Sequence, residues 1–324
     1  MANTTTIPIA RTRGSVAQIL WQGGTVIALI ALIVLFGAMR PEAFLSVSNL
    51  RNVLEQVAIL AIIAAAQTVV MVVDDIDLSV GSNASLSGAT AAALMIGGTP
   101  VPLAVAGALV VGLLVGVVNG ILVAYMKLSA IVATLATMTA VGGLAFIVTD
   151  GTTLYGMPEE FNVLGQGRVW GLPLPVIFAM IVALLIWLVL RFTTAGRRWY
   201  AVGGNAEVAR LSGVNVRWSR FLAFAVCGFV SSIGGVLLVS RLASASSSGG
   251  ANYMMFAIAA VFLGMTILQS GSANIGGTLV GVGIIGVMQN GLNIVGVNTY
   301  VQQVLTGVII VAAVTLSALK SRGR

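Results

Sequence analysis

Long, continuous apolar runs are the feature that most constrains what this chain can fold into. Hydrophobic residues make up 58% of its 324 residues and charged residues only 8%, whereas a soluble domain carries roughly 25% charged residues. A helix needs about 20 mostly apolar residues to cross a bilayer. The runs do not alternate, which favours helices over the strands of a membrane barrel. The sequence therefore predicts an all-α polytopic membrane protein and excludes a water-soluble globule.

The breaks between the apolar runs predict about ten transmembrane helices. The predicted spans are residues 20–39, 53–73, 79–97, 102–123, 130–149, 173–190, 220–240, 253–269, 275–295 and 301–319. Arg11 and Arg13 precede the first span as in a signal peptide, but no A-x-A-like cleavage site follows it, so we expect a retained helix. We expect one transmembrane domain over 20–319, with cytoplasmic tails at 1–19 and 320–324.

The distribution of Lys and Arg predicts the orientation. If both termini are cytoplasmic, only Arg40, Arg51, Arg168 and Arg241 of the 16 basic residues fall outside, as the enrichment of Lys and Arg in cytoplasmic loops requires. The net charge of +7 then reflects membrane topology, and a nucleic-acid surface is the weaker interpretation. Two long loops, 150–172 outside and 191–219 inside, are candidates for protein contacts.

Ten spans with both ends on one side divide into five plus five, and the second half then runs opposite to the first. This pattern is typical of an inverted repeat. Weak sequence similarity between residues 116–122 and residues 286–292 supports an inverted repeat, although chance similarity of two glycine-rich helices explains it equally well. Small residues four apart let helices approach closely, which favours tight packing as the role of these glycines. They are Gly112, Gly116 and Gly120 in one span, and Gly277 and Gly281 in another.

The composition removes several kinds of chemistry. The chain has no His and one Cys, Cys227, so imidazole catalysis, His-ligated metals and an internal disulfide framework are excluded, and we expect neither a catalytic residue nor a metal site. Ionisable groups near spans are functional hypotheses. Asp74, Asp75 and Asp77 stand with Ser79 between the second and third spans. Capping of the third span by Asp77 or Ser79 is the favoured interpretation; cation coordination, proton coupling and lining of a substrate path are the alternatives.

Uncharged amides also occur in or at the ends of the spans. They can hydrogen-bond a hydroxyl-rich solute or join one helix to another, and the second role is favoured. Together with the two capping candidates, these residues are the candidates for a translocation path or a structural turn: Gln67, Asp77, Ser79, Asn119, Asn290 and Asn293, with Gln269 as a further intramembrane amide.

The inner loop 191–219 contains a predicted two-turn helix at residues 206–212. Asn205 is a good N-cap, Glu207 favours the first turn and can pair with Arg210, and Gly213 suits the C-terminal stop. Leu211 and its neighbour on the same face, Val208, form an apolar protrusion. Because so short a helix is marginal in water, it needs a partner, either a groove on a cytoplasmic protein or the lipid headgroup surface.

At this loop the sequence resembles the permease subunits of ATP-binding-cassette importers of the ribose/xylose/autoinducer-2 type. One matching stretch is I-D-L-S-V-G-S at residues 76–82; the other comprises residues 196–197, 200–205 and 209–213. The similarity extends from about residue 44 to 319. The family usually has small residues, often Gly-Gly, before I-D-L-S, whereas this chain has Asp74 and Asp75. A different sugar and a local ion pair both explain the departure.

The resemblance implies a type II importer-like permease of the bacterial inner membrane that carries a ribose- or pentose-like monosaccharide by alternating access. Its implied partners are a second permease subunit (identical or not), two cytoplasmic ATPase subunits and an extracytoplasmic sugar-binding protein, with membrane lipid around it and no nucleic acid. The residues implied to couple it to the ATPase are Gly203, Gly204, Asn205, Glu207, Ala209, Arg210, Leu211, Ser212 and Gly213.

The residues themselves agree that the ATPase is another chain. ATP hydrolysis by this chain would need G-x-x-x-x-G-K-[ST], and neither Lys127 nor Lys320 follows a glycine. We therefore expect a non-enzyme that binds no cofactor, with ATP and Mg on the partner subunit.

The alternative from another class is an ion-coupled secondary transporter that uses Asp74, Asp75, Asp77 or Glu55, since inverted repeats suit such proteins. It is disfavoured because the aspartates crowd one turn near a span end. A membrane-embedded enzyme is disfavoured because the chain offers no set of acid and base side chains outside this turn. A passive channel is disfavoured because it would leave the predicted helix of the inner loop without a function.

Overall fold

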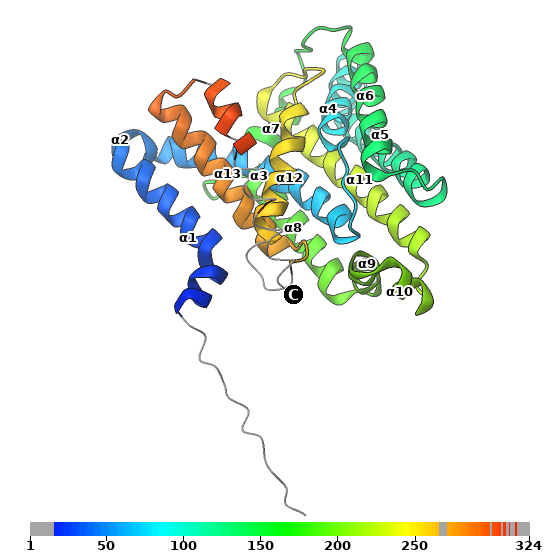
Figure 1. Cartoon of the computed structure of the whole chain (residues 1–324). Helices are drawn as coiled ribbons and strands as arrows, with labels where there is room; N and C mark the ends of the chain where they lie inside the picture. Colours follow the sequence, from blue (N-terminus) through cyan, green and yellow to red (C-terminus); the bar gives the residue numbers. More distant parts are fainter. Residues whose placement is uncertain are drawn as a thin grey trace, which may run out of the picture.

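The computed structural model describes residues 16–265, 271–298, 300–305, 307, 308, 311 and 315, and these are helical almost throughout (Figure 1). The first-half elements are α1 (Val16–Met39), α2 (Pro41–Phe44), α3 (Val47–Val72), α4 (Val80–Ile96), α5 (Val101–Gly120), its π-helical continuation η1 (Ile121–Tyr125) and α6 (Ala130–Thr149). The others are α7 (Glu159–Gln166), β1 (Arg168–Val169), β2 (Leu172–Pro173), α8 (Leu174–Phe192), α9 (Thr194–Gly204), α10 (Ala206–Leu211), α11 (Val216–Leu242), α12 (Ala251–Met265) and α13 (Ile275–Val295).

The first nine predicted spans each coincide with a helix, within a few residues at each end. Among the residues that the structure describes, six helices are long and apolar enough to cross a membrane: α3, α5 with η1, α6, α8, α11 and α13; residues 26–39 of α1 and all of α12 are shorter apolar helices. Of the tenth predicted span, residues 301–305 are helical and most of the rest lie outside the described residues. The predicted tails lie largely outside them too, although α1 begins at Val16, within the predicted tail 1–19.

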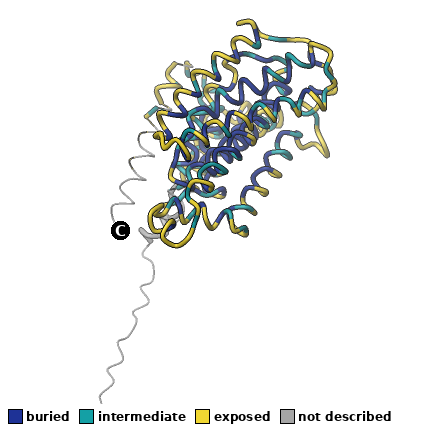
Figure 2. Tube along the Cα trace, turned by 90° about the vertical axis from the view of Figure 1, so that its right-hand side faces the viewer, coloured by how far each residue is buried: buried dark blue, intermediate teal, exposed yellow. Residues whose placement is uncertain are grey.

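Two helices, α3 and α11, form the centre of the bundle. Every residue from 58 to 70 of α3 is buried, as expected for a helix that is apolar on all sides. In Figure 2 the buried residues form the inside of the bundle and the exposed ones its surface. Helix α3 packs against α12 and α13, α11 packs against α4 and α5, and the two central helices pack on each other. Each of the two central helices therefore packs mainly against helices from the other half of the chain.

The predicted glycine faces lie at close helix crossings. A Cβ atom at Gly116 of α5 would meet the Phe224 carbonyl and the Gly228 Cα of α11, so the two backbones touch. In the second half, Gly277 of α13 lies against the backbone of Gly264 in α12. Packing is therefore sufficient to explain both glycine patterns.

The connection between α6 and α8 is folded. Helix α7 buries Phe161 completely, and β1 and β2 form a short antiparallel hairpin in which Arg168 pairs with Pro173. Neither element was predicted. The hairpin tip, Trp170, is 99% exposed.

Large aliphatic side chains cover the outside of α5, α6 and α8. Soluble proteins rarely expose contiguous apolar patches of this kind, whereas a membrane protein presents them to lipid. Examples are Leu114, Val132, Ile147, Leu184 and Leu185.

Candidate functional site

Helix α10 occupies residues 206–211, where the sequence predicts a helix over 206–212. Asn205 is its N-cap: the side-chain Oδ1 accepts hydrogen bonds from the backbone N–H groups of Glu207 and Val208, both at 3.0 Å. The Arg210 Nε donates to Glu207 Oε2 at 3.1 Å, as the spacing predicts. Gly213 follows with a φ of +84°, a left-handed conformation that ends the helix at low cost.

The two apolar side chains of α10 point away from the protein. Leu211 is 74% and Val208 58% exposed, while Ala209, on the other face, is buried. The hydrogen bond with Arg210, and the positive charge of that residue, lower the pKa of Glu207, so the pair is fully charged at neutral pH. The exposed face of α10 is therefore an apolar protrusion flanked by charges.

Helix α9, which was not predicted, fixes α10 to the centre of the bundle. Thr193 caps α9 by accepting from the Gly196 N–H at 3.2 Å. The indole Nε1 of Trp199 donates to the Ser219 carbonyl of α11 at 2.9 Å. Gly203 lies directly against the backbone of Val72, at the end of α3, and leaves no room for a Cβ atom. A displacement of α9 and α10 therefore acts on both central helices.

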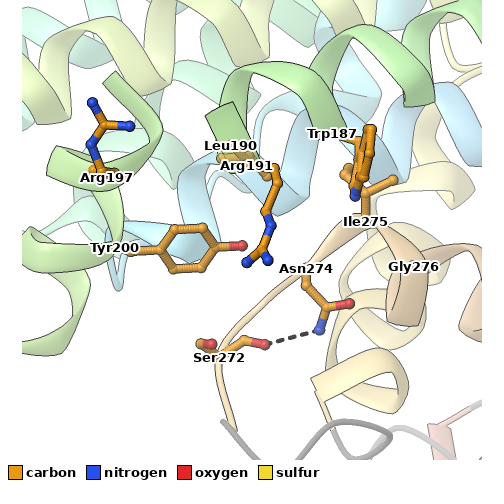
Figure 3. Close-up of a pocket in the computed structure, with 9 residues that line it drawn as sticks. All are labelled: Trp187, Leu190, Arg191, Arg197, Tyr200, Ser272, Asn274, Ile275 and Gly276. Carbon is orange, nitrogen blue, oxygen red and sulfur yellow. Dashed lines mark hydrogen bonds between the residues drawn. The ribbon is translucent and has the colours of Figure 1, made fainter. Parts of the chain in front are cut away.

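A cavity of about 580 Å³ lies between the end of α8, α9 and the start of α13 (Figure 3). The Arg191 side chain lies between Tyr200 and Asn274 in this view, and Arg197 extends from α9. The Tyr200 hydroxyl donates to the Ala273 carbonyl at 3.0 Å, and Asn274 caps α13 by accepting from the Gly277 N–H at 2.7 Å. Two arginines and no acidic residue are among the described residues that line the cavity, so this part of the α10 end of the bundle is basic.

The turn between α3 and α4 explains the two aspartates that depart from the family pattern. Asp74 is exposed and has a φ of +64°, a left-handed conformation that glycine adopts most easily and that Asp tolerates. Asp75 is only 4% exposed in its side chain and forms a two-point ion pair with Arg220 of α11, with the Arg220 Nε donating to Asp75 Oδ2 at 2.7 Å. A different sugar and a local ion pair were the two explanations for this departure, and the structure contains the ion pair.

Asp77 lies in a closed polar cluster. Its Oδ1 accepts from the Ser79 N–H at 2.8 Å and from the Ser79 hydroxyl at 2.6 Å. The Asn119 amide donates to the Ser79 hydroxyl oxygen at 2.8 Å and accepts from the Thr137 hydroxyl at 2.6 Å. With its amide oriented to satisfy both groups, Gln67 bonds the Asp77 carbonyl at 3.0 Å and its N–H at 3.3 Å. Because each partner is buried, the cluster joins α3, α4, α5 and α6 as a structural turn.

Asp77 accepts from the N–H of Ser79 in the turn just before α4, but Ser79 is the N-cap of that helix and makes no side-chain capping bond, so neither residue caps the first turn of α4 in the way predicted. Asn290 forms two reciprocal amide hydrogen bonds with Asn49, at 2.8 and 3.0 Å, and so joins α13 to α3. Asn293 is exposed, and Gln269 lies outside the described residues. In the sequence, Arg220 counted only as one of the basic residues that predict the membrane orientation. Its ion pair could not be predicted, because its partner, Asp75, lies 145 residues away.

Comparison with known proteins decides the family. The model of the family described as "Branched-chain amino acid transport system / permease component" matches residues 49–314. The chain belongs to this permease family. It is thus a multi-pass membrane transport component, consistent with its apolar helices.

Named relatives of this permease include sugar transporters. The chain is 40% identical to the ribose import permease protein RbsC of Haemophilus influenzae over 292 residues, which cover 89% of this chain and 90% of the relative. It is 39% identical to RbsC of Escherichia coli K12, with 91% and 93% covered. The D-allose transport system permease protein AlsC of E. coli is 35% identical, with 92% of each chain covered. No solved structure matches the chain.

Proposed function

We propose that this permease is the pore-forming subunit of an ATP-driven importer that takes up a monosaccharide, of the ribose or pentose class, by alternating access. The relatives named for ribose import, which align over nine-tenths of both chains, support the substrate class. The observation that carries the proposal is α10, a capped helix that exposes Val208 and Leu211 while α9 ties it to α3 and α11.

The α10 end is the proposed docking surface for cytoplasmic ATPase subunits, which would hold the ATP and Mg. The apolar side chains of α10 would enter a groove on the ATPase, and the basic residues around them suit an acidic rim. Both termini would then be cytoplasmic, in a bacterial inner membrane. The opposite end, with α7 and the hairpin tip at Trp170, would receive an extracytoplasmic sugar-binding protein; exposed Glu159 and Glu160 lie there. A second permease subunit, identical or related, would complete the pore.

In the proposed mechanism, ATP-driven closure of the ATPase subunits displaces α9 and α10. The Trp199–Ser219 hydrogen bond and the contact of Gly203 with Val72 pass the movement to α11 and α3. Since each central helix packs mainly against helices of the other half, their movement rocks one half against the other. No bond of the sugar is made or broken.

The ion-coupled alternative finds no support in the aspartates that it would use. Asp75 is neutralised by Arg220, and Asp77 is enclosed by the groups that donate hydrogen bonds to it. Both carboxylates serve to hold the α3–α4 turn.

The test is the double variant Leu211→Asp with Arg210→Glu, co-expressed with an ATPase subunit and a sugar-binding protein that support uptake by the wild-type permease. The variant should insert normally, lose ATPase association and lose ATP-dependent sugar uptake. Leu211→Ile, which keeps the protrusion apolar, is the matched control and should retain both. Normal uptake by the double variant, or uptake driven by an ion gradient without ATP, would refute the proposal.

A further inference from the structure

A second cavity, of about 170 Å³, lies between α3, α12 and α13, towards the end of the bundle opposite α10. Gln56 of α3 and Gln289 of α13 line it from two sides, and Asn252, Tyr253 and Phe256 line it from α12. We propose that this cavity is a binding subsite for one neutral monosaccharide on the transport path. The proposal rests on the proposed function and adds the location of the site and the groups that recognise the sugar.

The polar groups of the cavity have unused hydrogen-bonding capacity. Within the described part of the chain, neither the Tyr253 hydroxyl nor the Asn252 amide has a side-chain hydrogen bond, and the Gln56 Nε2 reaches Gln289 Oε1 only at 3.4 Å. Asn252 is exposed, whereas Gln56, Tyr253 and Gln289 are half-buried, and polar groups that are removed from bulk water are normally satisfied by protein, ordered water or ligand. Two glutamine amides, an asparagine amide and a phenol together supply several donors and acceptors, which matches a solute that carries a hydroxyl on most of its carbons.

The cavity suits a neutral ligand. Within the described ranges, no Asp, Glu, Lys or Arg lines it, whereas the cavity beside α9 is lined by Arg191 and Arg197 (Figure 3). A charged solute would lose hydration without gaining a counter-charge, which is costly. The rings of Tyr253 and Phe256 add apolar surface against which the C–H face of a sugar ring can pack. Amides together with aromatic rings therefore point to a sugar rather than to an ion or an amino acid.

The size of the cavity limits the ligand. Its volume of about 170 Å³ corresponds to roughly five or six waters at about 30 Å³ each. A single sugar ring can replace that much water, so the volume matches one monosaccharide unit.

The position of the cavity links it to transport. Its walls come from α3 in the first half of the chain and from α12 and α13 in the second half, and transporters of inverted-repeat architecture bind substrate at the interface between repeats. A movement of one half against the other changes the separation of Gln56 and Gln289. A sugar hydroxyl that bridges the two amides would consequently be bound in one state and released in the other.

The experiment compares sugar uptake and ATP hydrolysis in proteoliposomes that contain the permease with its ATPase and binding protein. Wild-type uptake of D-ribose tests the proposed function. Gln289→Leu and Tyr253→Phe then test the subsite: we expect D-ribose uptake to fall about tenfold, as loss of a hydrogen bond worth about 1.4 kcal/mol implies, while ATP hydrolysis stimulated by the loaded binding protein stays within twofold. Asn52→Leu, an exposed amide one turn before Gln56, is the matched control and should transport as the wild type does.

A second measurement separates recognition from folding. Transport of 2-deoxy-D-ribose, which lacks one hydroxyl, should be slower than that of D-ribose in the wild type, and this preference should shrink in at least one of the two variants. A structural defect would lower the transport of both sugars by the same factor. If wild-type protein imports ribose but both variants retain its rate and its preference, or lose both sugars equally, the subsite assignment is wrong while the proposed function stands.

Discussion

Arg220, in the first turns of α11, donates hydrogen bonds to both carboxylate oxygens of Asp75, in the turn that follows α3. The pair joins the two central helices at the α10 end, close to where Trp199 and Gly203 attach α9 to the same helices. Two contacts therefore attach α9 to the central helices, the ion pair joins those helices to each other, and the ion pair can be tested alone.

Arg220→Met should destabilise the fold by about 2 to 3 kcal/mol, because removal of one partner leaves the buried Asp75 carboxylate without a counter-charge; the value is reduced because Arg220 is 33% exposed. Thermal unfolding in detergent measures it. The double variant Arg220→Met with Asp75→Asn should recover much of the loss. Equal loss in the single and the double variant would show that packing of the Arg220 stem, and not its charge, is what matters.

Asp77→Ala should destabilise the protein by about 2 to 4 kcal/mol, because it leaves the Ser79 N–H and the Ser79 hydroxyl without their buried acceptor. The yield of folded, monodisperse protein should fall. The rate of sugar uptake divided by the amount of that folded protein should fall less. Asp77→Asn, which keeps one acceptor oxygen, is the milder comparison. Stable Asp77→Ala protein that has lost ATP-driven uptake would contradict the structural role.

Gly116→Ala should cost about 1 to 3 kcal/mol, since its Cβ atom would meet the backbone of α11. Gly143→Ala in α6 is the matched control: nothing lies within 4 Å of its added Cβ atom, so it should leave stability unchanged or raise it slightly. Denaturation of the two variants in the same detergent compares them. Similar stability for both would mean that the α5–α11 crossing is looser than described.

Asn205→Ala should weaken α10 by about 1 kcal/mol, because two backbone N–H groups lose their capping oxygen. ATPase association should fall about fivefold, a factor that corresponds to that energy. An Asn205→Asp variant, which keeps the capping oxygen, is the control and should bind as tightly as the wild type in a pull-down with the ATPase. Unchanged association of Asn205→Ala would indicate that the partner, rather than the cap, orders α10.

The Glu207–Arg210 pair should make no contribution to pH dependence near neutrality. The pKa of Glu207 is lowered below its ordinary value of 4.5, so its stabilising effect is present above that value and is lost only as the pH falls through the lowered folded pKa. The uptake ratio of Glu207→Gln to wild type should therefore stay constant from about pH 6 to about pH 8. A ratio that changes across this range would show that another titrating group faces the pair.

The spans were predictable because a bilayer demands long apolar helices, and the N-cap, ion pair and stop of α10 were predictable because each depends on neighbours within four residues. The glycine faces were predictable from their period, although the sequence did not say that α5 meets α11. Local rules were sufficient wherever the partner lay on the same element.

What the sequence could not predict depends on distant pairing. Nothing local indicates that Arg220 meets Asp75, that Asn49 meets Asn290 across 241 residues, or that Tyr253 and Gln289 line one cavity. Helix α9 was missed because its stability comes from the buried Trp199, and α7 because burial of Phe161 against the bundle holds it. In each case tertiary packing, rather than local propensity, determines the structure.

The left-handed backbone at Asp74 has an evolutionary consequence. Divergence at this position is restricted by conformation rather than by chemistry, so homologues should exchange Asp with Gly or Asn and avoid Val, Ile and Thr. Asp75, by contrast, should be free to become glycine only in lineages that have also replaced Arg220. The two adjacent aspartates of this protein thus meet two unrelated structural constraints, one from backbone geometry at Asp74 and one from a distant counter-charge at Asp75.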